Sequence, residues 1–126
     1  MKFRTIPCIA LLFVLLAGAA RADTLLGKWT CEFDSQIGVQ KYVFEFTESD
    51  GRVLGFATFE RSLGNGRIEL KEIHHVGEKV SFVEPFSFDG NEIAIRYSGT
   101  LAGNEMKLRR DVGDFATEHI VARRAE

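Results

Sequence analysis

The stretch SFVEPFSFDGNEIAIRYSGTLAGNEMKLRRDV, residues 81–112, decides the fold because it holds three strand patterns separated by two tight-turn signals. Apolar and polar residues alternate along each pattern, with the period of two that is typical of a half-buried strand. The two turn signals repeat a Gly-Asn-Glu sequence, at residues 90–92 and 103–105. Glycine-containing turns of this length join antiparallel neighbours, so the stretch predicts a β-meander.

The same alternation extends in both directions from this stretch, and no window has a helical stripe. The pattern predicts eight strands, over residues 28–34, 39–48, 52–60, 67–76, 79–88, 92–99, 105–112 and 116–124. Eight strands on about 100 residues with short turns indicate an all-β, up-and-down antiparallel meander that closes into a small barrel. A two-sheet sandwich is the alternative architecture.

Residues 1–22 have the features of a secretory signal peptide. Two basic residues lie near the start, an apolar stretch covers residues 6–20, and residues 20–22 match the Ala-x-Ala cleavage pattern. The apolar stretch is shorter than the roughly 20 residues of a membrane-spanning helix. We therefore expect one domain over residues 23–126, exported to the periplasm or the medium of a bacterium, with no membrane contact after cleavage.

The domain that remains after cleavage is acidic. Three of the 16 basic residues and none of the 18 acidic residues lie in the leader, which leaves 13 basic residues and a net charge of −5. Nucleic-acid binding needs clustered Lys and Arg, so we expect no nucleic-acid partner. Cys8 also lies in the leader, so Cys31 stands alone and cannot form an intramolecular disulfide. We expect Cys31 to be buried and unreactive.

The turns also predict which residues face one another across the strands. If both Gly-Asn pairs form two-residue loops, Glu84 faces Tyr97 and Tyr97 faces Arg110. Matching apolar residues across the preceding hairpin places Glu72 opposite Glu84. A two-residue turn in the last hairpin brings His119 beside Arg110. The sequence therefore predicts a row of polar side chains on the face that otherwise forms the core.

This polar row is the candidate ligand-binding site: Glu72, Glu84, Tyr97 and Arg110, with Tyr42 and His119 as second choices. One interpretation is a buried network that fixes the register of the strands. Another is a polar patch in a ligand cavity. A third is a catalytic carboxylate pair, since opposed residues have Cβ atoms about 5 Å apart and retaining glycosidases hold their carboxyl groups roughly 5–5.5 Å apart.

The predicted interior argues against a bound sugar, because aromatic side chains fill it. Nine aromatic residues have inner parity: Trp29, Phe33, Tyr42, Phe44, Phe46, Phe59, Phe82, Phe86 and Phe88. We expect no cofactor and no catalytic residue, although the glutamate pair keeps an enzyme open as an alternative.

Other groupings of reactive residues predict little chemistry. His74 and His75 are adjacent and point to opposite faces of a strand, so we expect no metal site there. Acidic residues near the last turn are typical of solvated surface. On the outer face, Val43, Leu54 and Phe56 form a small apolar patch that is a candidate site for a protein partner.

Two short motifs resemble the calycin pattern. Gly27-Lys28-Trp29 opens the first strand of the domain, and Arg123-Arg124 closes the last strand. The resemblance implies a lipocalin-like barrel in which a G-x-W tryptophan at the closed end packs under an arginine from the final strand. Strand parity points both Trp29 and Arg123 inward.

Longer stretches are similar to a group of short exported bacterial β-barrel proteins, whose members often carry glycoside hydrolase or xylanase labels. The similar stretches are residues 27–29, 34–42, 112–118 and 122–124. This resemblance implies a carbohydrate context. Our leading prediction is an exported β-barrel that binds a small molecule or a partner without catalysis. The alternatives are a carbohydrate-active protein that uses Glu72 and Glu84, and an interaction or inhibitor protein that acts through an outer sheet face.

Overall fold

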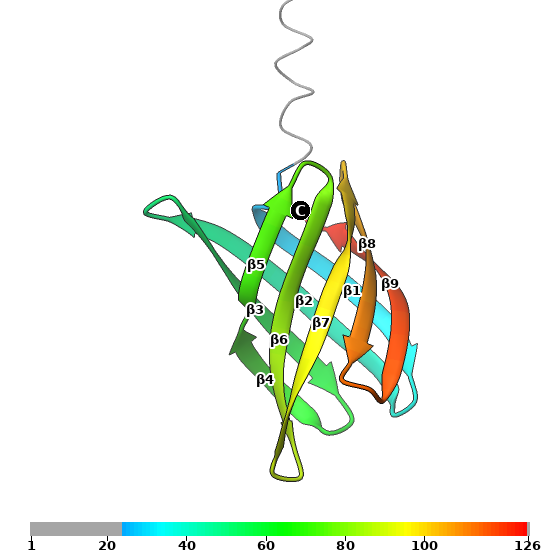
Figure 1. Cartoon of the computed structure of the whole chain (residues 1–126). Helices are drawn as coiled ribbons and strands as arrows, with labels where there is room; N and C mark the ends of the chain where they lie inside the picture. Colours follow the sequence, from blue (N-terminus) through cyan, green and yellow to red (C-terminus); the bar gives the residue numbers. More distant parts are fainter. Residues whose placement is uncertain (1–23, 126) are drawn as a thin grey trace, which may run out of the picture.

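The strands form one antiparallel sheet in the computed structural model, which describes residues 24–125 (Figure 1). The nine strands are β1 (Gly27–Ser35), β2 (Gly38–Ser49), β3 (Arg52–Arg61), β4 (Gly64–Glu69), β5 (Lys71–Val76), β6 (Lys79–Phe88), β7 (Asn91–Ala102), β8 (Glu105–Val112) and β9 (Ala116–Arg124). Within these residues no helix is long and apolar enough to span a membrane. The predicted leader, residues 1–22, lies outside the described residues.

The order of the strands is β4-β3-β2-β1-β9-β8-β7-β6-β5. Strands that follow one another in the chain are paired from β1 to β4 and from β5 to β9. The first strand, β1, also pairs with the last, β9, and the sheet curls around its apolar face (Figure 1). The all-β antiparallel meander is therefore confirmed, and the sheet is single rather than a sandwich. The edge strands β4 and β5 are not paired with each other, so hydrogen bonds do not close the sheet.

The sheet has nine strands rather than eight because the predicted strand 67–76 divides at Leu70. The backbone N–H of Leu70 donates to the Gly55 carbonyl of β3 at 2.8 Å. Glu72 then takes a φ of 51°, outside the β region, and the pairing register shifts between Lys71 and His74. The chain consequently leaves β3, which pairs with β4, and continues as β5 along β6.

The predicted register is correct for the β7–β8 hairpin and shifted in the preceding β6–β7 hairpin. Tyr97 lies opposite Arg110, as predicted. Glu84 pairs with Ile95 rather than with Tyr97, because Asp89-Gly90 forms the turn, with φ values of 54° and 80° that suit a two-residue hairpin loop. Moving the turn by one residue shifts the pairing by two, so every side chain keeps its predicted face.

The prediction for the last hairpin is wrong by one residue. Phe115 donates its backbone N–H to the Val112 carbonyl at 2.9 Å, and residues 113–115 form a three-residue turn. Arg110 therefore pairs with Glu118, and His119 lies exposed on the outer face. A shift of one residue exchanges the two faces of a strand, which is why Glu118 is inside instead.

The inner face carries the aromatic core that the alternation predicts. Trp29, Tyr42, Phe44, Phe46 and Phe82 are buried, and Phe33, Phe59 and Phe86 pack against them in part. Phe88, at the end of β6, is 50% exposed and does not belong to the core. Cys31 is buried as predicted, and burial raises the pKa of its thiol to about 11.

Trp29 lies under the guanidinium of Arg124, whose central carbon is 4.2 Å from the ring centroid. Strand parity predicted that Arg123 would point inward with Trp29, but Arg124 is the residue opposite Trp29 in the pairing of β1 with β9. Arg123 lies on the outer face, where it forms an ion pair with Glu105. The indole N–H donates to the Leu25 carbonyl at 2.9 Å. Arg124 itself donates to three backbone carbonyl oxygens, those of Thr24, Leu26 and Gly103.

Candidate functional site

The two ends of the curled sheet are built differently (Figure 1). At one end lie the first and last described residues and the hairpins β2–β3, β5–β6 and β7–β8; we call it the terminal end. At the other lie the hairpins β1–β2, β3–β4, β6–β7 and β8–β9; we call it the cleft end. The buried polar side chains lie towards the cleft end.

Glu84 on β6 is the most enclosed of these polar groups, with 0% of its surface exposed. Its carboxylate accepts three hydrogen bonds from side chains. Tyr97 donates from Oη to Oε1 at 2.8 Å, while Tyr42 Oη at 3.0 Å and Arg61 Nη1 at 3.2 Å donate to Oε2. Three donors around one carboxylate compensate for its removal from water.

Arg110 on β8 is the second centre of the cluster and is also buried. Its Nε donates to Tyr97 Oη at 2.9 Å, its Nη2 donates to Tyr42 Oη at 3.0 Å, and its Nη1 donates to Glu118 Oε1 at 2.7 Å. Both tyrosine hydroxyls therefore bridge Arg110 to Glu84. The positive charge of Arg110 is not in direct contact with Glu84 but reaches it through two phenols.

These side chains form one connected cluster, which we call the polar network. It consists of Gln40, Tyr42, Arg61, Glu84, Tyr97, Arg110 and Glu118. Two arginines and two glutamates give it a formal charge of zero. Buried charges are tolerated when they are paired and hydrogen-bonded, and every charge of the network has a partner of opposite sign or a phenol bridge to one.

Burial also determines the protonation state of the two phenols. Removal from water, together with the negative charge of Glu84, raises the pKa of Tyr42 to about 12. The same two causes raise the pKa of Tyr97 well above its usual value. Both hydroxyls therefore stay protonated, and available as donors to Glu84, to a higher pH than an exposed tyrosine hydroxyl would.

A cleft of about 210 Å³ opens beyond the polar network at the cleft end. Four polar side chains line its base: Gln40, Arg61, Arg110 and Glu118. Its walls are mainly apolar: Ile37, Leu63, Phe86, Phe88, Ile93, Ile95, Val112 and Phe115. The cleft thus combines an apolar wall with a charged, internally paired base, which is typical of a ligand site.

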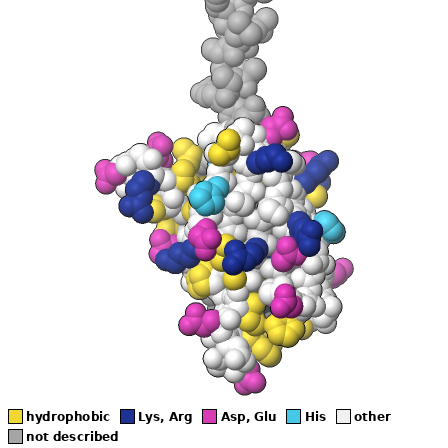
Figure 2. Space-filling view, in the orientation of Figure 1, with side chains coloured by type: hydrophobic (Ala, Val, Ile, Leu, Met, Phe, Trp, Pro, Cys, Tyr) yellow, Lys and Arg dark blue, Asp and Glu magenta, His cyan; other side chains and the backbone are white. Residues whose placement is uncertain are grey.

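Four of the wall residues also protrude into solvent. Ile37, Leu63, Phe88 and Phe115 are between 45% and 74% exposed, and each comes from a different hairpin of the cleft end. Figure 2 shows hydrophobic side chains gathered towards this end of the molecule. Exposed apolar residues scattered singly need no explanation, but these four lie around one opening, which makes the cleft end the candidate site.

Arg61 is a site residue that the sequence did not reveal. It ends β3, and its guanidinium lies between two rings, 3.8 Å from the Phe59 centroid and 4.7 Å from that of Phe86. The predicted strand stopped at residue 60. Extending the alternation of Ala57 and Phe59 by two residues would have placed Arg61 on the inner face.

The structure brings together only part of the predicted row. Tyr42, Glu84, Tyr97 and Arg110 meet in the polar network. Glu72 does not, because the bulge after Leu70 leaves it exposed, so the predicted Glu72–Glu84 pair does not form. His119 is exposed on the outer face, and Glu118 takes its predicted place beside Arg110.

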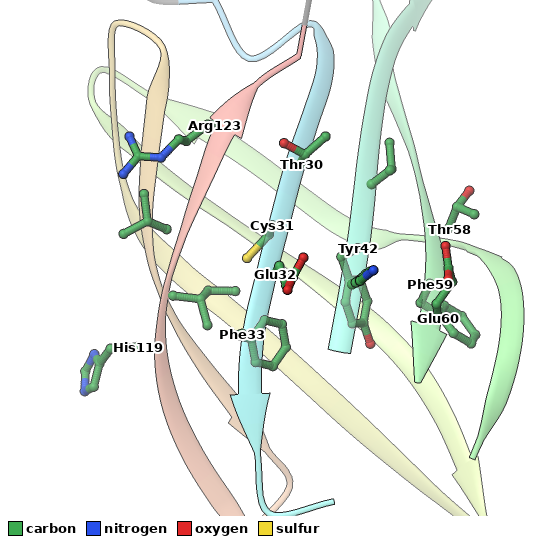
Figure 3. Close-up of a pocket in the computed structure, with 14 residues that line it drawn as sticks. Thr30, Cys31, Glu32, Phe33, Tyr42, Thr58, Phe59, Glu60, His119 and Arg123 are labelled. Carbon is green, nitrogen blue, oxygen red and sulfur yellow. The ribbon is translucent and has the colours of Figure 1, made fainter. Parts of the chain in front are cut away.

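A second hollow lies on the outer face of β1, β2, β3 and β9 (Figure 3). It is wider than the cleft, but none of its charged side chains is buried: Glu32, Lys41, Glu60 and Arg123 are all exposed. It also contains His119. Exposed charges of both signs are typical of ordinary solvated surface, so we place the candidate site in the cleft.

The predicted outer apolar patch is only partly open to solvent. Val43 is exposed, whereas Leu54 and Phe56 are half-buried. The guanidinium of Arg67 lies 4.0 Å from the centroid of the Phe56 ring and covers it. Within residues 24–125 no group of three or more His, Cys, Asp and Glu side chains could hold a metal ion.

No protein-family model, curated protein or solved structure matches this chain. The function must therefore be argued from the geometry of the cleft and the polar network.

Proposed function

We propose that this protein is an exported binding protein that takes the apolar part of a ligand into the cleft. The observation that carries the proposal is the ring of four exposed apolar side chains around a cleft whose base is a neutral, hydrogen-bonded network. Covering such side chains removes apolar surface from water, at about 25 cal/mol per Å². The export part of the proposal rests on the leader pattern of residues 1–22.

The size of the cleft supports a ligand group of modest volume. An apolar cavity of about 150 Å³ holds a benzene molecule, so 210 Å³ has room for one substituted ring or a short branched alkyl group. The polar network supplies a rigid base, because its buried charges are paired without a ligand.

Binding has more support than catalysis. Glu84 is enclosed by three donors and has no exposed surface through which it could reach a substrate. Glu72, the second carboxylate of a glycosidase-like pair, lies elsewhere. The carbohydrate-active alternative therefore lacks its reacting pair.

We also propose that the curled sheet is an incompletely closed barrel of the calycin type. The support is the contact of Arg124 with Trp29, which reproduces the arginine-over-tryptophan arrangement that the two sequence motifs resemble. The hydrogen bond from Leu70 to Gly55 and the packing of Ile73 near Gly55 bring the two edges of the sheet together.

Titration with N-phenyl-1-naphthylamine, an uncharged probe that fluoresces in apolar surroundings, tests the binding function. The phenyl ring of the probe suits the cleft, and its naphthyl group would cover the exposed apolar side chains around the opening. We expect saturable binding by the purified protein. Leu63→Ser/Phe115→Ser should lower the affinity about tenfold, since two apolar contacts of roughly 1 kcal/mol or less each are lost.

The matched control is Val76→Ser/Val121→Ser, which changes two exposed apolar residues away from the cleft. It should bind the probe like the unchanged protein. Equal loss in both doubles, or no saturable binding, would contradict the proposal. Urea unfolding of both variants establishes that the fold is retained.

A further inference from the structure

Five exposed acidic side chains lie at the cleft end, and we call them the acidic ring. Asp34, Glu60, Asp89, Glu92 and Asp114 are exposed on or beside the four hairpins of the cleft end. These hairpins, taken as residues 33–40, 60–66, 86–93 and 111–118, contain no lysine, and their one arginine is Arg61. Because the side chain of Arg61 is only 9% exposed and lies against Glu84, it does not offset the outer acids.

The terminal end has no such excess. Its three hairpins, taken over a similar span as residues 47–54, 74–81 and 100–107, hold four acidic residues, Glu48, Asp50, Glu78 and Glu105, and three basic residues, Arg52, Lys79 and Lys107. The acidic ring is therefore a local property of the cleft end and not simply the result of the acidic composition of the domain. The polar network is neutral and does not offset the ring. The exposed cations near the ring lie outside the four hairpins, with Lys41 opposite Glu60 and with Arg96 and Arg109 in an outer hollow that Glu92 and Asp114 also line.

We propose that the natural occupant of the cleft is a basic segment of a partner protein, with a large apolar side chain in the cleft and lysines or arginines on either side of it. This rests on the proposed binding function of the cleft. The apolar side chain covers the ring of exposed hydrophobic residues, and the flanking cations face the acidic ring.

Two observations favour a peptide segment over a small molecule. The exposed apolar side chains come from four hairpins and extend beyond a 210 Å³ cleft, so a ligand that only filled the cleft would leave them uncovered. Within residues 24–125, Arg61 donates hydrogen bonds through Nη1 alone, and it lines the cleft. Its Nε and Nη2 groups suit the carbonyl oxygens of a peptide backbone.

The same acidic ring disfavours two other occupants. A second copy of this chain, docked through the same end, would place acidic ring against acidic ring. A bilayer that contains anionic lipid would repel the ring as the apolar side chains approached it. A cationic partner with an apolar side chain is favoured by both the exposed apolar side chains and the acidic ring.

Calorimetric titration with three synthetic peptides tests the proposal. The probe is Gly-Lys-Lys-Phe-Lys-Lys-Gly, and its two controls replace phenylalanine by serine or all lysines by glutamate. We expect saturable binding of the probe, at least tenfold weaker binding of the serine peptide, and no binding of the glutamate peptide. The affinity for the probe should fall about tenfold or more between 50 and 500 mM NaCl.

Two triple variants separate a local acidic ring from general charge attraction. Asp89→Asn/Glu92→Gln/Asp114→Asn removes three acids at the cleft end, and Glu48→Gln/Asp50→Asn/Glu78→Gln removes three at the terminal end. Asp89 and Asp50 are matched, because both precede glycine in a turn at φ 54° and 53°, a conformation that asparagine accepts. Only the first variant should bind the probe peptide less tightly, by about tenfold.

Equal effects of the two triple variants, absence of peptide binding, or preferential binding to vesicles of phosphatidylcholine with phosphatidylglycerol would overturn the proposal. N-phenyl-1-naphthylamine distinguishes this failure from failure of the binding function. If the uncharged probe still binds in the cleft, only the basic partner is wrong. If neither probe binds, the binding function is wrong as well.

Discussion

Arg124 at the terminal end and Arg110 at the cleft end place the same side chain in two different environments. Both guanidinium groups lie near aromatic rings, at 4.2 Å from the centroid of Trp29 and 5.0 Å from that of Phe33. Arg124 donates to backbone carbonyl oxygens, whereas Arg110 donates to the side chains of tyrosines and a glutamate.

The difference shows which end depends on charge balance. These carbonyl oxygens and the Asn104 side-chain oxygen, which also accepts from Arg124, are neutral, so Arg124 joins the first and last described strands without needing a buried carboxylate. Arg110 is almost fully buried and is tolerated only while Glu84 and Glu118 oppose its charge. The terminal end therefore depends on neutral acceptors, whereas the cleft end contains a balanced set of buried charges beneath the cleft.

The largest effect should come from Arg110→Met, which leaves the half-buried Glu118 without a counter-charge, removes a donor from both phenols and leaves Glu84 with Arg61 alone. We expect a loss of about 3–5 kcal/mol in the free energy of unfolding, measured by urea denaturation at pH 7. A loss below about 1 kcal/mol would show that the network does not stabilise the fold and would remove the contrast between the ends.

Alkaline pH should destabilise the folded protein in part through Tyr42 of the polar network. The pKa of Tyr42 is about 12 in the folded protein and ordinarily about 10, so its stabilising contribution is complete below pH 10 and is lost as pH rises towards 12. Two units correspond to roughly 2–3 kcal/mol. Urea unfolding between pH 8 and 12 should show a steeper alkaline decline in the unchanged protein than in Tyr42→Phe. Parallel declines would contradict the buried placement of this phenol.

Arg124→Met should cost less, about 1–2 kcal/mol in urea unfolding, because it removes one cation–π contact and hydrogen bonds that water partly replaces. It should not change binding of N-phenyl-1-naphthylamine in the cleft. If this variant weakened probe binding as much as the cleft-end double Leu63→Ser/Phe115→Ser, the two ends would not act separately.

The smallest effect should come from the two Asp-Gly turns. Asp50→Gly and Asp89→Gly each place glycine at a positive φ at opposite ends of the molecule. Because glycine accepts this conformation readily, we expect both changes to shift the unfolding free energy by less than about 0.5 kcal/mol, and equally. Unequal shifts would mean that the turns also contribute to the difference between the ends.

The local parts of the structure could be predicted from the sequence. Alternation predicts that Tyr42, Glu84, Tyr97 and Arg110 share the inner face, and the structure places them there. A turn misplaced by one residue in the β6–β7 hairpin left this result intact, because the resulting shift in pairing was even.

Bulges and turn lengths that shift the register by one residue could not be predicted in the same way. Glu72 lies outside the predicted row because a bulge follows Leu70. Glu118, not His119, lies beside Arg110 because the last turn has three residues. No residue type near these positions predicts a shift of one residue in the register, and such a shift exchanges the two faces of a strand. The sequence shows that the four hairpins contain acidic and apolar residues. It does not show that these hairpins lie together at one end of the sheet, around a cleft.

By itself, the sequence determined the antiparallel meander and the face of each strand on which most side chains lie, because alternation and short turns act between near neighbours. Only the tertiary structure decided which inner side chains meet. Tyr42 on β2 donates to Glu84 on β6, although β1, β9, β8 and β7 separate these strands in the sheet. They meet because the sheet curls around its aromatic core and brings distant strands face to face across it.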